Sequence, residues 1–232
     1  EAFQYYLVQA SMNLAQEKGK CEYFDRTKYA DGKMPIDHYK ADLDKVCSTT
    51  LKLNWEKLRK QVKQFGMRNS TLSAQMPSES SSVVSNATNG IEPPRGFLSV
   101  KKSKKGPLKQ IVPQYKTLKD YYTLLWNMQS NDGYINIVSV MQKFFDQAIS
   151  GNWSYNPTHF ENNEVPMSIM FKDLLTTYKL GWKTSYYQNT YDFKTDASVE
   201  EVQVAPIQIA AEEFAKANLE VQAGDDCDAC NI

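Results

Sequence analysis

The chain has 232 residues, 27 basic and 27 acidic side chains, and an apolar content of 41%. This length allows one large domain or two small ones with an ample core, and the balanced charge gives no field that would favour nucleic acid or an anionic membrane. No apolar stretch is long enough to span a bilayer and the N-terminus lacks a secretory signal pattern, so we expect a soluble, cytoplasmic protein.

The cysteines and histidines exclude two common kinds of site. Four cysteines, at positions 21, 47, 227 and 230, are too few and too unevenly placed for a disulfide framework. The two histidines, His38 and His159, stand far apart without acidic or cysteine partners at a recognised spacing. A zinc site or a histidine-based triad is therefore not predicted.

The first segment is helical in pattern up to Gly19, which is a typical helix end. One apolar stripe contains Ala2, Phe3, Tyr6, Leu7, Ala10 and Leu14, and further apolar residues lie beside or opposite it. A surface that wide predicts a helix covered on more than one side. We therefore expect the chain to continue something larger.

Two further helices and a strand are predicted before position 80. Asp37–Val46 forms the first helix, and Trp55–Phe65 forms the second, which Gly66 ends. Alternating apolar residues over Leu72–Met76 then fit a strand with one covered face. Helix, glycine, strand, loop and helix in succession indicate an α/β layer or barrel.

A serine cluster follows that strand, in the sequence Pro77-Ser-Glu-Ser-Ser-Ser82, and a short helical turn begins near Val83. Serine hydroxyls beside unpaired backbone N–H groups at a helix start can hold a phosphate. Ordinary helix capping explains the local pattern as well. The position after a strand favours ligand binding, because ligands gather at the carboxyl ends of strands in α/β folds. Both interpretations stay open on these residues alone.

The middle of the chain predicts a hairpin and then helices. Turn formers fill Asn86–Arg95, and two strands, Phe97–Val100 and Leu108–Val112, flank a loop with four lysines. A solvated hairpin tip accounts for that loop better than a nucleic-acid patch, which would need interleaved aromatics. Further elements are helices at Leu118–Met128, Ile135–Ile149 and Met167–Leu180, a turn at Asn131–Gly133, and a loop that holds Trp153, Tyr155 and Pro157.

Thr184–Thr190 is predicted as a short strand that contains Tyr186 and Tyr187. Neighbours on a regular strand point to opposite faces, so the two rings would touch only if the backbone turns there. Without other information, a pair of strand aromatics, one in and one out, is the simplest interpretation.

The chain changes character after Tyr191. Asp192–Ile232 has ten acidic residues and two lysines, few aromatics and no clear strand, which predicts a mobile tail. It ends with Cys227-Asp-Ala-Cys230. Two thiols on a flexible tail can form a disulfide and exchange it, whereas metal binding would need a second pair of ligands. We predict two parts, 1–191 and a tail, 192–232.

Several motifs in this order resemble the C-terminal portion of the large, catalytic (alpha) subunit of class Ia ribonucleoside-diphosphate reductase. The residues that carry the resemblance are Arg68-Asn-Ser-Thr-Leu-Ser-Ala74, Met76-Pro-Ser-Glu-Ser-Ser-Ser82, Asn86-Ala-Thr-Asn-Gly-Ile-Glu-Pro-Pro-Arg-Gly96, Asn131-Asp-Gly-Tyr134 and Tyr186-Tyr-Gln-Asn-Thr190. The likeness extends from about Tyr5 to Thr190 and resumes at the cysteine pair. It implies the second half of a ten-stranded α/β barrel with several helices and a mobile acidic tail.

The resemblance also implies roles for residues. The loop of Pro77, Ser78, Glu79, Ser80 and Ser81 would bind the substrate diphosphate. Tyr186 and Tyr187 would pass a radical from the small (beta) subunit, which carries a dimetal-tyrosyl cofactor, toward an active-site cysteine. Cys227 and Cys230 would re-reduce the active-site disulfide and be reduced in turn by thioredoxin or glutaredoxin. The family more often spaces this tail pair more widely.

Other parts of the family's machinery are expected on an N-terminal part of the large subunit, either a separate polypeptide of a split subunit or a segment that was cut away. These are the thiyl-radical cysteine, its neighbours and the nucleotide-effector domain; Cys21 and Cys47 match none of them. The chain is therefore expected to be inactive alone and to bind no cofactor or metal directly. The alternative is a non-enzymatic interaction module whose CxxC tail binds metal or regulates assembly.

Overall fold

The structure is a computed structural model that describes residues 1–88, 90–103 and 106–192. Contacts divide the chain into Glu1–Tyr191 and Asp192–Ile232, and all described residues except Asp192 belong to the first unit. The predicted tail with Cys227 and Cys230 therefore lies outside the described residues, as do Asn89 of the predicted turn and residues 104–105 of the basic loop. The division into two domains stays a prediction.

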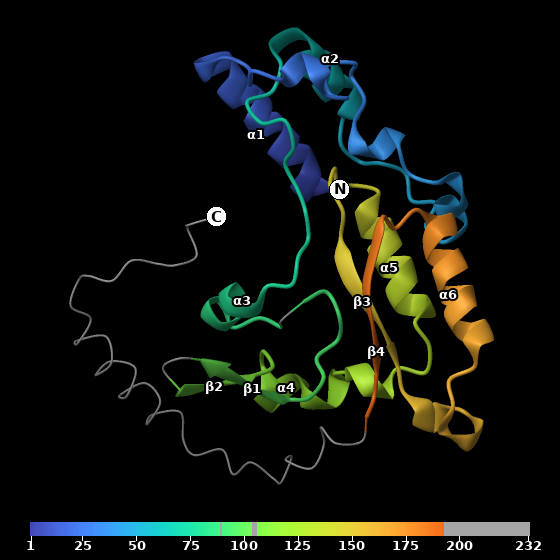
Figure 1. Cartoon of the computed structure of the whole chain (residues 1–232). Coiled ribbons are helices and arrows are strands. Elements are labelled where there is room, and N and C mark those ends of the chain that lie inside the picture. Colours follow the sequence, from blue (N-terminus) through green and yellow to red (C-terminus); the bar gives the residue numbers. More distant parts are fainter. Residues whose placement is uncertain (89, 104–105, 193–232) are drawn as a thin grey trace, which may run out of the picture. The chain divides into compact units, whose positions relative to one another are not determined.

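Helices α1 (Ala2–Lys18) and α2 (Trp55–Phe65) lie side by side and share one core (Figure 1). Each ends where predicted, at Gly19 (φ 81°) and Gly66 (φ 78°), in a backbone region that glycine enters without steric cost. The core between them is formed by Tyr5, Val8, Met12, Phe24, Tyr29, Met34, Ile36, Trp55, Leu58, Val62 and Met67.

The buried face of α1 is not the apolar stripe that the sequence emphasised. Tyr5, Val8 and Met12 face the core, whereas Phe3 is 65% exposed and Tyr6 56% exposed. The wide apolar surface is real, but within the described residues only one side of it is covered.

Three short 3-10 turns connect α1 to α2, namely η1 (Phe24–Arg26), η2 (Pro35–Asp37) and η3 (Ala41–Lys45). The predicted helix Asp37–Val46 was therefore wrong. The Asp37 carboxylate accepts a hydrogen bond from the Met34 N–H at 2.7 Å and also binds Arg59 of α2. With Lys40 in an extended conformation (φ −82°, ψ 129°), the chain cannot continue as one helix.

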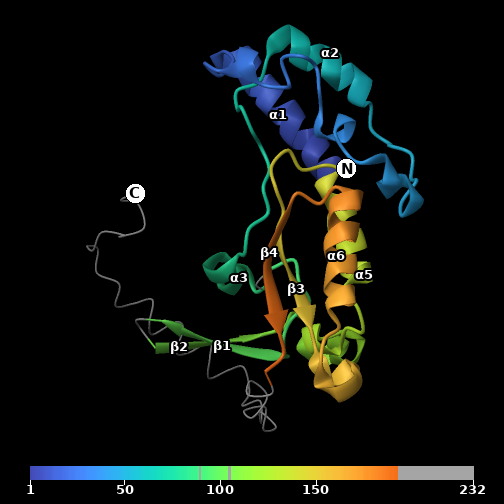
Figure 2. The same ribbon diagram turned by 45° about the vertical axis from the view of Figure 1, so that its right-hand side comes forward.

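Strands β3 (Ser150–Tyr155) and β4 (Thr184–Thr190) pair in parallel, and helix α6 (Met167–Leu180) connects them. Helix α5 (Asp132–Gln142) lies beside α6, and both cover one face of the strand pair (Figures 1 and 2). The core between these layers is formed by Leu43, Tyr134, Ile135, Val138, Ile149, Trp153, Tyr155, Leu180 and Trp182. This β–α–β unit confirms the α/β class. Helix α6 and its end at Gly181, and the strand at β4, are also confirmed.

The segment between α5 and β3 differs from the prediction in two respects. The helix predicted to reach Ile149 ends at Gln142, and the predicted loop with Trp153 and Tyr155 is strand β3. The Gln142 side chain donates to the Gln147 carbonyl at 2.8 Å and accepts from the Ile149 N–H at 3.1 Å. These bonds turn the chain from helix to strand. The predicted turn at Asn131–Gly133 instead begins α5.

The predicted strand Leu72–Met76 is extended but short of a full strand, since Gln75 makes a single parallel bridge to Ile149. Helix α3 (Glu79–Ser85) follows it and begins four residues before Val83, where the helical turn was expected. The predicted hairpin is confirmed, with β1 (Leu98–Ser103) antiparallel to β2 (Gly106–Ile111).

No helix spans Leu118–Met128; short α4 (Tyr115–Leu118), η4 (Lys119–Tyr121) and η5 (Leu125–Asn127) replace it, because the Leu125 N–H bonds to the distant Pro94 carbonyl.

Two further short 3-10 turns, η6 (Pro157–His159) and η7 (Glu161–Asn163), lead from β3 to α6. Within residues 1–88, 90–103 and 106–192, no helix has both the length and the apolar character needed to cross a membrane.

Candidate functional site

Tyr186 and Tyr187 of β4 lie against each other on an exposed surface. Their ring centroids are 4.1 Å apart with an interplanar angle of 51°. The Tyr187 hydroxyl donates to the Tyr186 hydroxyl oxygen at 3.4 Å, and this bond is the main cause that raises the pKa of Tyr187. The side chains are 54% and 58% exposed, so both phenols are accessible from solvent.

A β-bulge explains how adjacent residues can present their rings together. Gly151 pairs with Ser185 but Trp153 pairs with Gln188, so Asn152 alone lies opposite two residues of β4, Tyr186 and Tyr187. A bulge places an extra residue in one strand and interrupts the alternation of side chains. The sequence indicated that contact would require a turn of the backbone, and the bulge provides it.

The Asn152 side chain forms hydrogen bonds both with the bulge in β4 and with Glu92. Its side-chain oxygen accepts a hydrogen bond from the Tyr187 N–H at 3.0 Å. Its side-chain amide and its backbone N–H both donate to the Glu92 carboxylate, at 2.7 and 2.8 Å. The turn-rich segment before β1 is thereby connected to the backbone of the tyrosine pair.

A buried aromatic layer supports the same strand. A Cβ atom at Gly151 would lie 2.3 Å from the Tyr134 hydroxyl and 2.7 Å from the Trp182 ring, so only glycine fits there. Burial, followed by the negative charge of Glu92, raises the pKa of Tyr134. The strand opposite the tyrosines therefore rests on a close-packed layer.

The serine segment lies at the start of α3. Ser78 is the N-cap residue, but its side chain makes no capping hydrogen bond, and the Ser82 N–H bonds to the Ser78 carbonyl at 2.8 Å. Pro77 precedes it, and Glu79, Ser80 and Ser81 form the first helical turn. The extended residue Gln75, beside Ile149, leads into this segment, as expected for a loop that follows a strand.

Asp146 anchors the chain just before the serines. Its carboxylate accepts hydrogen bonds from the Leu72 N–H at 2.7 Å, the Ser73 N–H at 2.9 Å and the Tyr29 hydroxyl at 3.0 Å. The segment that enters the serine loop is therefore held by backbone bonds to a single carboxylate.

The structure thus brings the two tyrosines together on β4 and places the five loop residues at the start of another element, α3. Cys227 and Cys230 lie outside the described residues. Within the part of the chain that the structure describes, no group of three or more His, Cys, Asp or Glu residues could hold a metal ion.

Asn152 and Glu92 were missed as site residues. Asn152 looks like a chance N-x-Ser triplet in the sequence, and Glu92 is one residue of a turn-rich motif without a role of its own. The signal that could have found Asn152 is the tyrosine pair, since touching neighbours require a bulge and a bulge leaves a backbone N–H to be satisfied.

The fold and the surface define an α/β protein that displays two contacting tyrosines on a parallel strand pair. Residues 1–120 and 109–188 match the family described as the ribonucleotide reductase barrel domain. The chain belongs to this family.

Curated relatives agree with this assignment. The ribonucleoside-diphosphate reductase subunit alpha of Haemophilus influenzae is 61% identical over 196 residues, which are 84% of this chain and 26% of that protein. The ribonucleoside-diphosphate reductase 1 subunit alpha of Escherichia coli is 57% identical over 197 residues, which are 85% of this chain and 26% of that protein. The subunit alpha of phage T4 is 41% identical over 234 residues, 100% of this chain and 29% of the relative. The chain thus spans about a quarter of the length of these relatives.

Proposed function

We propose that this chain takes part in the reduction of ribonucleoside diphosphates to deoxyribonucleoside diphosphates, as one part of a larger alpha subunit that works with a radical-generating beta subunit. The observation that carries the proposal is the tyrosine pair, whose hydroxyl oxygens are 3.4 Å apart. Family membership and the names of the relatives support the reaction.

Tyr186 and Tyr187 serve as adjacent steps of radical transfer. When one phenol is oxidised, its neighbour gives up one electron and its hydroxyl proton, so the first phenol is restored and the second becomes the radical. The contact between the rings gives a route for the electron, and the hydroxyl–hydroxyl bond gives a route for the proton. Exposure of both rings leaves them open to a partner that delivers the radical, for which the dimetal-tyrosyl cofactor of a beta subunit is the expected source.

The serine segment binds the substrate diphosphate. Backbone N–H groups of the first turn of a helix have no partners within the helix and attract anions. Ser78 makes no capping bond, which leaves its hydroxyl available, and Ser81 is exposed. These features favour anion binding over simple capping for Pro77, Ser78, Glu79, Ser80 and Ser81.

Partners complete the assembly. The exposed apolar residues of α1, Phe3, Tyr6 and Leu14, fit a surface that another part of the alpha subunit covers. The parallel pair β3–β4 and the bridge at Gln75 fit one portion of a ten-stranded α/β barrel that such a part would close. Residues 192–232 tether Cys227 and Cys230, which exchange disulfides with the active site and with thioredoxin or glutaredoxin.

Reconstitution tests the proposal. The chain is mixed with a separately produced N-terminal part of the alpha subunit and with the beta subunit, and CDP reduction is measured with thioredoxin as reductant. We expect turnover only in the three-component mixture. Full turnover by the chain alone, or no dependence of turnover on this chain, would contradict the proposed role.

A further inference from the structure

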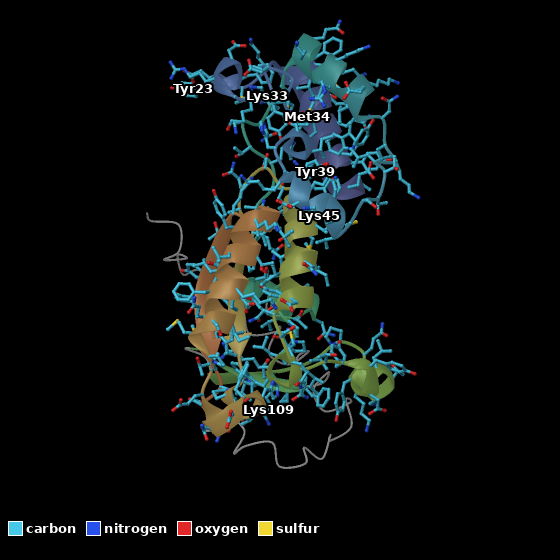
Figure 3. All side chains as sticks on the ribbon, turned by 90° about the vertical axis from the view of Figure 1, so that its right-hand side faces the viewer. Tyr23, Lys33, Met34, Tyr39, Lys45 and Lys109 are labelled. Atoms are coloured by element: carbon cyan, nitrogen blue, oxygen red, sulfur yellow. The ribbon has the colours of Figure 1, made fainter. Side chains whose placement is uncertain are left out.

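A cavity of about 330 Å³ lies between the segment 28–39, helix α5 with the residues after it, and the end of α6. Figure 3 shows Lys33, Met34 and Tyr39 following one another along the first of these walls. The volume is in the range of small-molecule sites. None of the residues assigned above to diphosphate binding or radical transfer is among the described residues that line it.

The walls of the cavity are strongly cationic. Five basic residues line it and one acidic residue, Asp146, does; the basic ones are Lys28, Lys33, His38, Lys143 and Lys183. The Asp146 carboxylate is already occupied by two backbone N–H groups and the Tyr29 hydroxyl. Positive charge therefore exceeds negative charge on this surface.

Several of these cations are only partly compensated. Lys28 has no ion pair among the described residues, and the Lys33 ammonium is 3.9 Å from Asp31 at an exposed position. Lys143 lies over the Tyr39 ring at 3.9 Å and is also 3.9 Å from Asp44, and Lys183 donates to the Asp146 carbonyl at 2.8 Å. Burial, then the charge of Lys28, lowers the pKa of His38. The cluster repels additional positive charge and attracts an anion.

An unpartnered hydroxyl points to a missing ligand. Ser139 of α5 lines the cavity, is 1% exposed, and its hydroxyl has no hydrogen-bond partner. A buried polar group without a partner costs free energy. Six described side chains contain such an atom, and among them Ser139 is the one that lines this cavity. The adjacent side chain of Gln142 is already engaged: its amide N–H groups donate to the carbonyls of Phe145 and Gln147, and its oxygen accepts from the N–H groups of Ile149 and Lys183.

The rest of the lining is mostly apolar and aromatic, and it consists of Tyr29, Met34, Pro35, Tyr39, Phe145, Leu180 and Gly181. Inorganic phosphate alone would leave this part of the cavity empty. We propose that the cavity binds a small phosphate monoester, with its phosphoryl group among Lys28, Lys33 and the Ser139 hydroxyl and its uncharged part against the apolar wall. Multiple lysines and a hydroxyl donor are the groups that recognise a phosphate dianion.

The chain carries its own reporters for a binding experiment. Its two histidines are His38, which lines the cavity, and His159, which belongs to η6 and does not. The imidazole NMR signals of the full 232-residue chain are followed during titration with phenyl phosphate and, separately, with inorganic phosphate, at constant pH and ionic strength. We expect phenyl phosphate to shift the His38 signal to saturation without moving the His159 signal, and to bind more tightly than inorganic phosphate.

Matched variants distinguish binding in this cavity from nonspecific attraction of the anion to lysines. Lys28→Gln with Lys33→Gln should weaken phenyl phosphate binding about tenfold, since two charge-assisted bonds are lost. The control pair Lys45→Gln with Lys109→Gln changes the net charge equally at two lysines outside the lining, also labelled in Figure 3, and should leave binding unchanged.

Ser139→Ala provides a second variant that keeps every charge. It should weaken binding about threefold while leaving the free chain at least as stable as the parent, because the hydroxyl that is removed has no partner and its burial costs free energy. An unmoved His38 signal, equal loss of binding in the two lysine pairs, or equal affinity for phenyl phosphate and inorganic phosphate would each overturn the proposal.

Discussion

The side chain of Asn152 holds the backbone of Tyr187: its carbonyl oxygen accepts the Tyr187 N–H at 3.0 Å. This bond satisfies a donor that the bulge removes from the regular ladder between β3 and β4. Because the Asn152 amide is in turn fixed by Glu92, the asparagine couples the turn-rich segment to the tyrosine pair.

Asn152→Ala should therefore disorder the tyrosine pair without unfolding the chain. It removes the bonds to Tyr187 and Glu92 and should cost about 1–2 kcal/mol of stability. Turnover in the reconstituted reductase should fall about tenfold, because proton-coupled transfer depends on the distance between the phenols. Gln188→Ala on the same strand is the control, because that side chain makes no hydrogen bond with the described residues. If both variants retained full turnover, the bulge would not position the radical pathway.

Tyr187→Phe tests the phenol itself. The ring contact with Tyr186 at 4.1 Å would remain, but the hydroxyl that donates to Tyr186 would be lost. We expect turnover to be abolished while the circular dichroism spectrum and substrate affinity stay unchanged. Tyr121→Phe, at a tyrosine that is 85% exposed, should have no effect. Turnover that survives in Tyr187→Phe would leave the pair with a role in aromatic contact alone.

The double variant Cys227→Ser with Cys230→Ser tests the thiol shuttle. It should stop repeated turnover with thioredoxin yet permit one turnover in a pre-reduced complex, because the first reduction needs only active-site thiols. Rapid-quench measurement of product per complex distinguishes the two regimes. Cys47→Ser, at a free cysteine, is the control. Unaltered thioredoxin-driven turnover in the double variant would remove the shuttle role.

Sequence patterns predicted the elements whose signals are local. The helices that end at Gly19, Gly66 and Gly181 are in place, and so is the pairing of β1 with β2, because caps and hairpins depend on neighbouring residues. The errors arose where distant groups decide the backbone. Gln142 ends a helix through bonds to residues after it, and Arg59 holds Asp37 from another helix.

The candidate site, too, could be predicted where its signals are local and not where they depend on other parts of the fold. The residue types of the serine segment and of the tyrosine pair could be recognised from the sequence, but the helical turn was expected near Val83, whereas α3 begins at Glu79. The contact between the tyrosines could not, because it depends on a strand register set by β3, and Asn152 gained its role only through that register. The resemblance to a known family suggested the functions, and the pairing of β3 with β4 determines the geometry of the tyrosine pair.

Alkaline pH should destabilise the fold through buried tyrosines. Burial and, next, the negative charge of Asp146 raise the pKa of Tyr29, and burial and Glu92 do the same for Tyr134. In the unfolded chain, the tyrosine hydroxyl has a pKa of about 10. The contribution of each neutral buried tyrosine to the free energy of unfolding is thus complete below about pH 10. It is lost as the pH rises from there toward the folded-state pKa, by about 1.4 kcal/mol per pH unit for each tyrosine.

Urea unfolding followed by tryptophan fluorescence, at several pH values between about 8 and about 11, measures this loss. Tyr29→Phe should make the decline above about pH 10 shallower, whereas Tyr121→Phe should not, because that ring is 85% exposed. A decline of the same slope in both variants would show that other groups cause it.

Asp146→Ala should affect stability and the serine segment together. The carboxylate accepts bonds from two backbone N–H groups, of Leu72 and Ser73, and from the Tyr29 hydroxyl. Losing them should cost about 3 kcal/mol, since bonds to a charged acceptor are stronger than neutral ones and the donors are left without a partner. The residues that lead into Ser78 would lose their anchor, so the KM for CDP in the reconstituted reductase should rise. Asp120→Ala is the control, because this exposed carboxylate makes no hydrogen bond or ion pair with the described residues. A stability loss in Asp146→Ala with an unchanged KM would show that the anchor supports the core without positioning the serine segment.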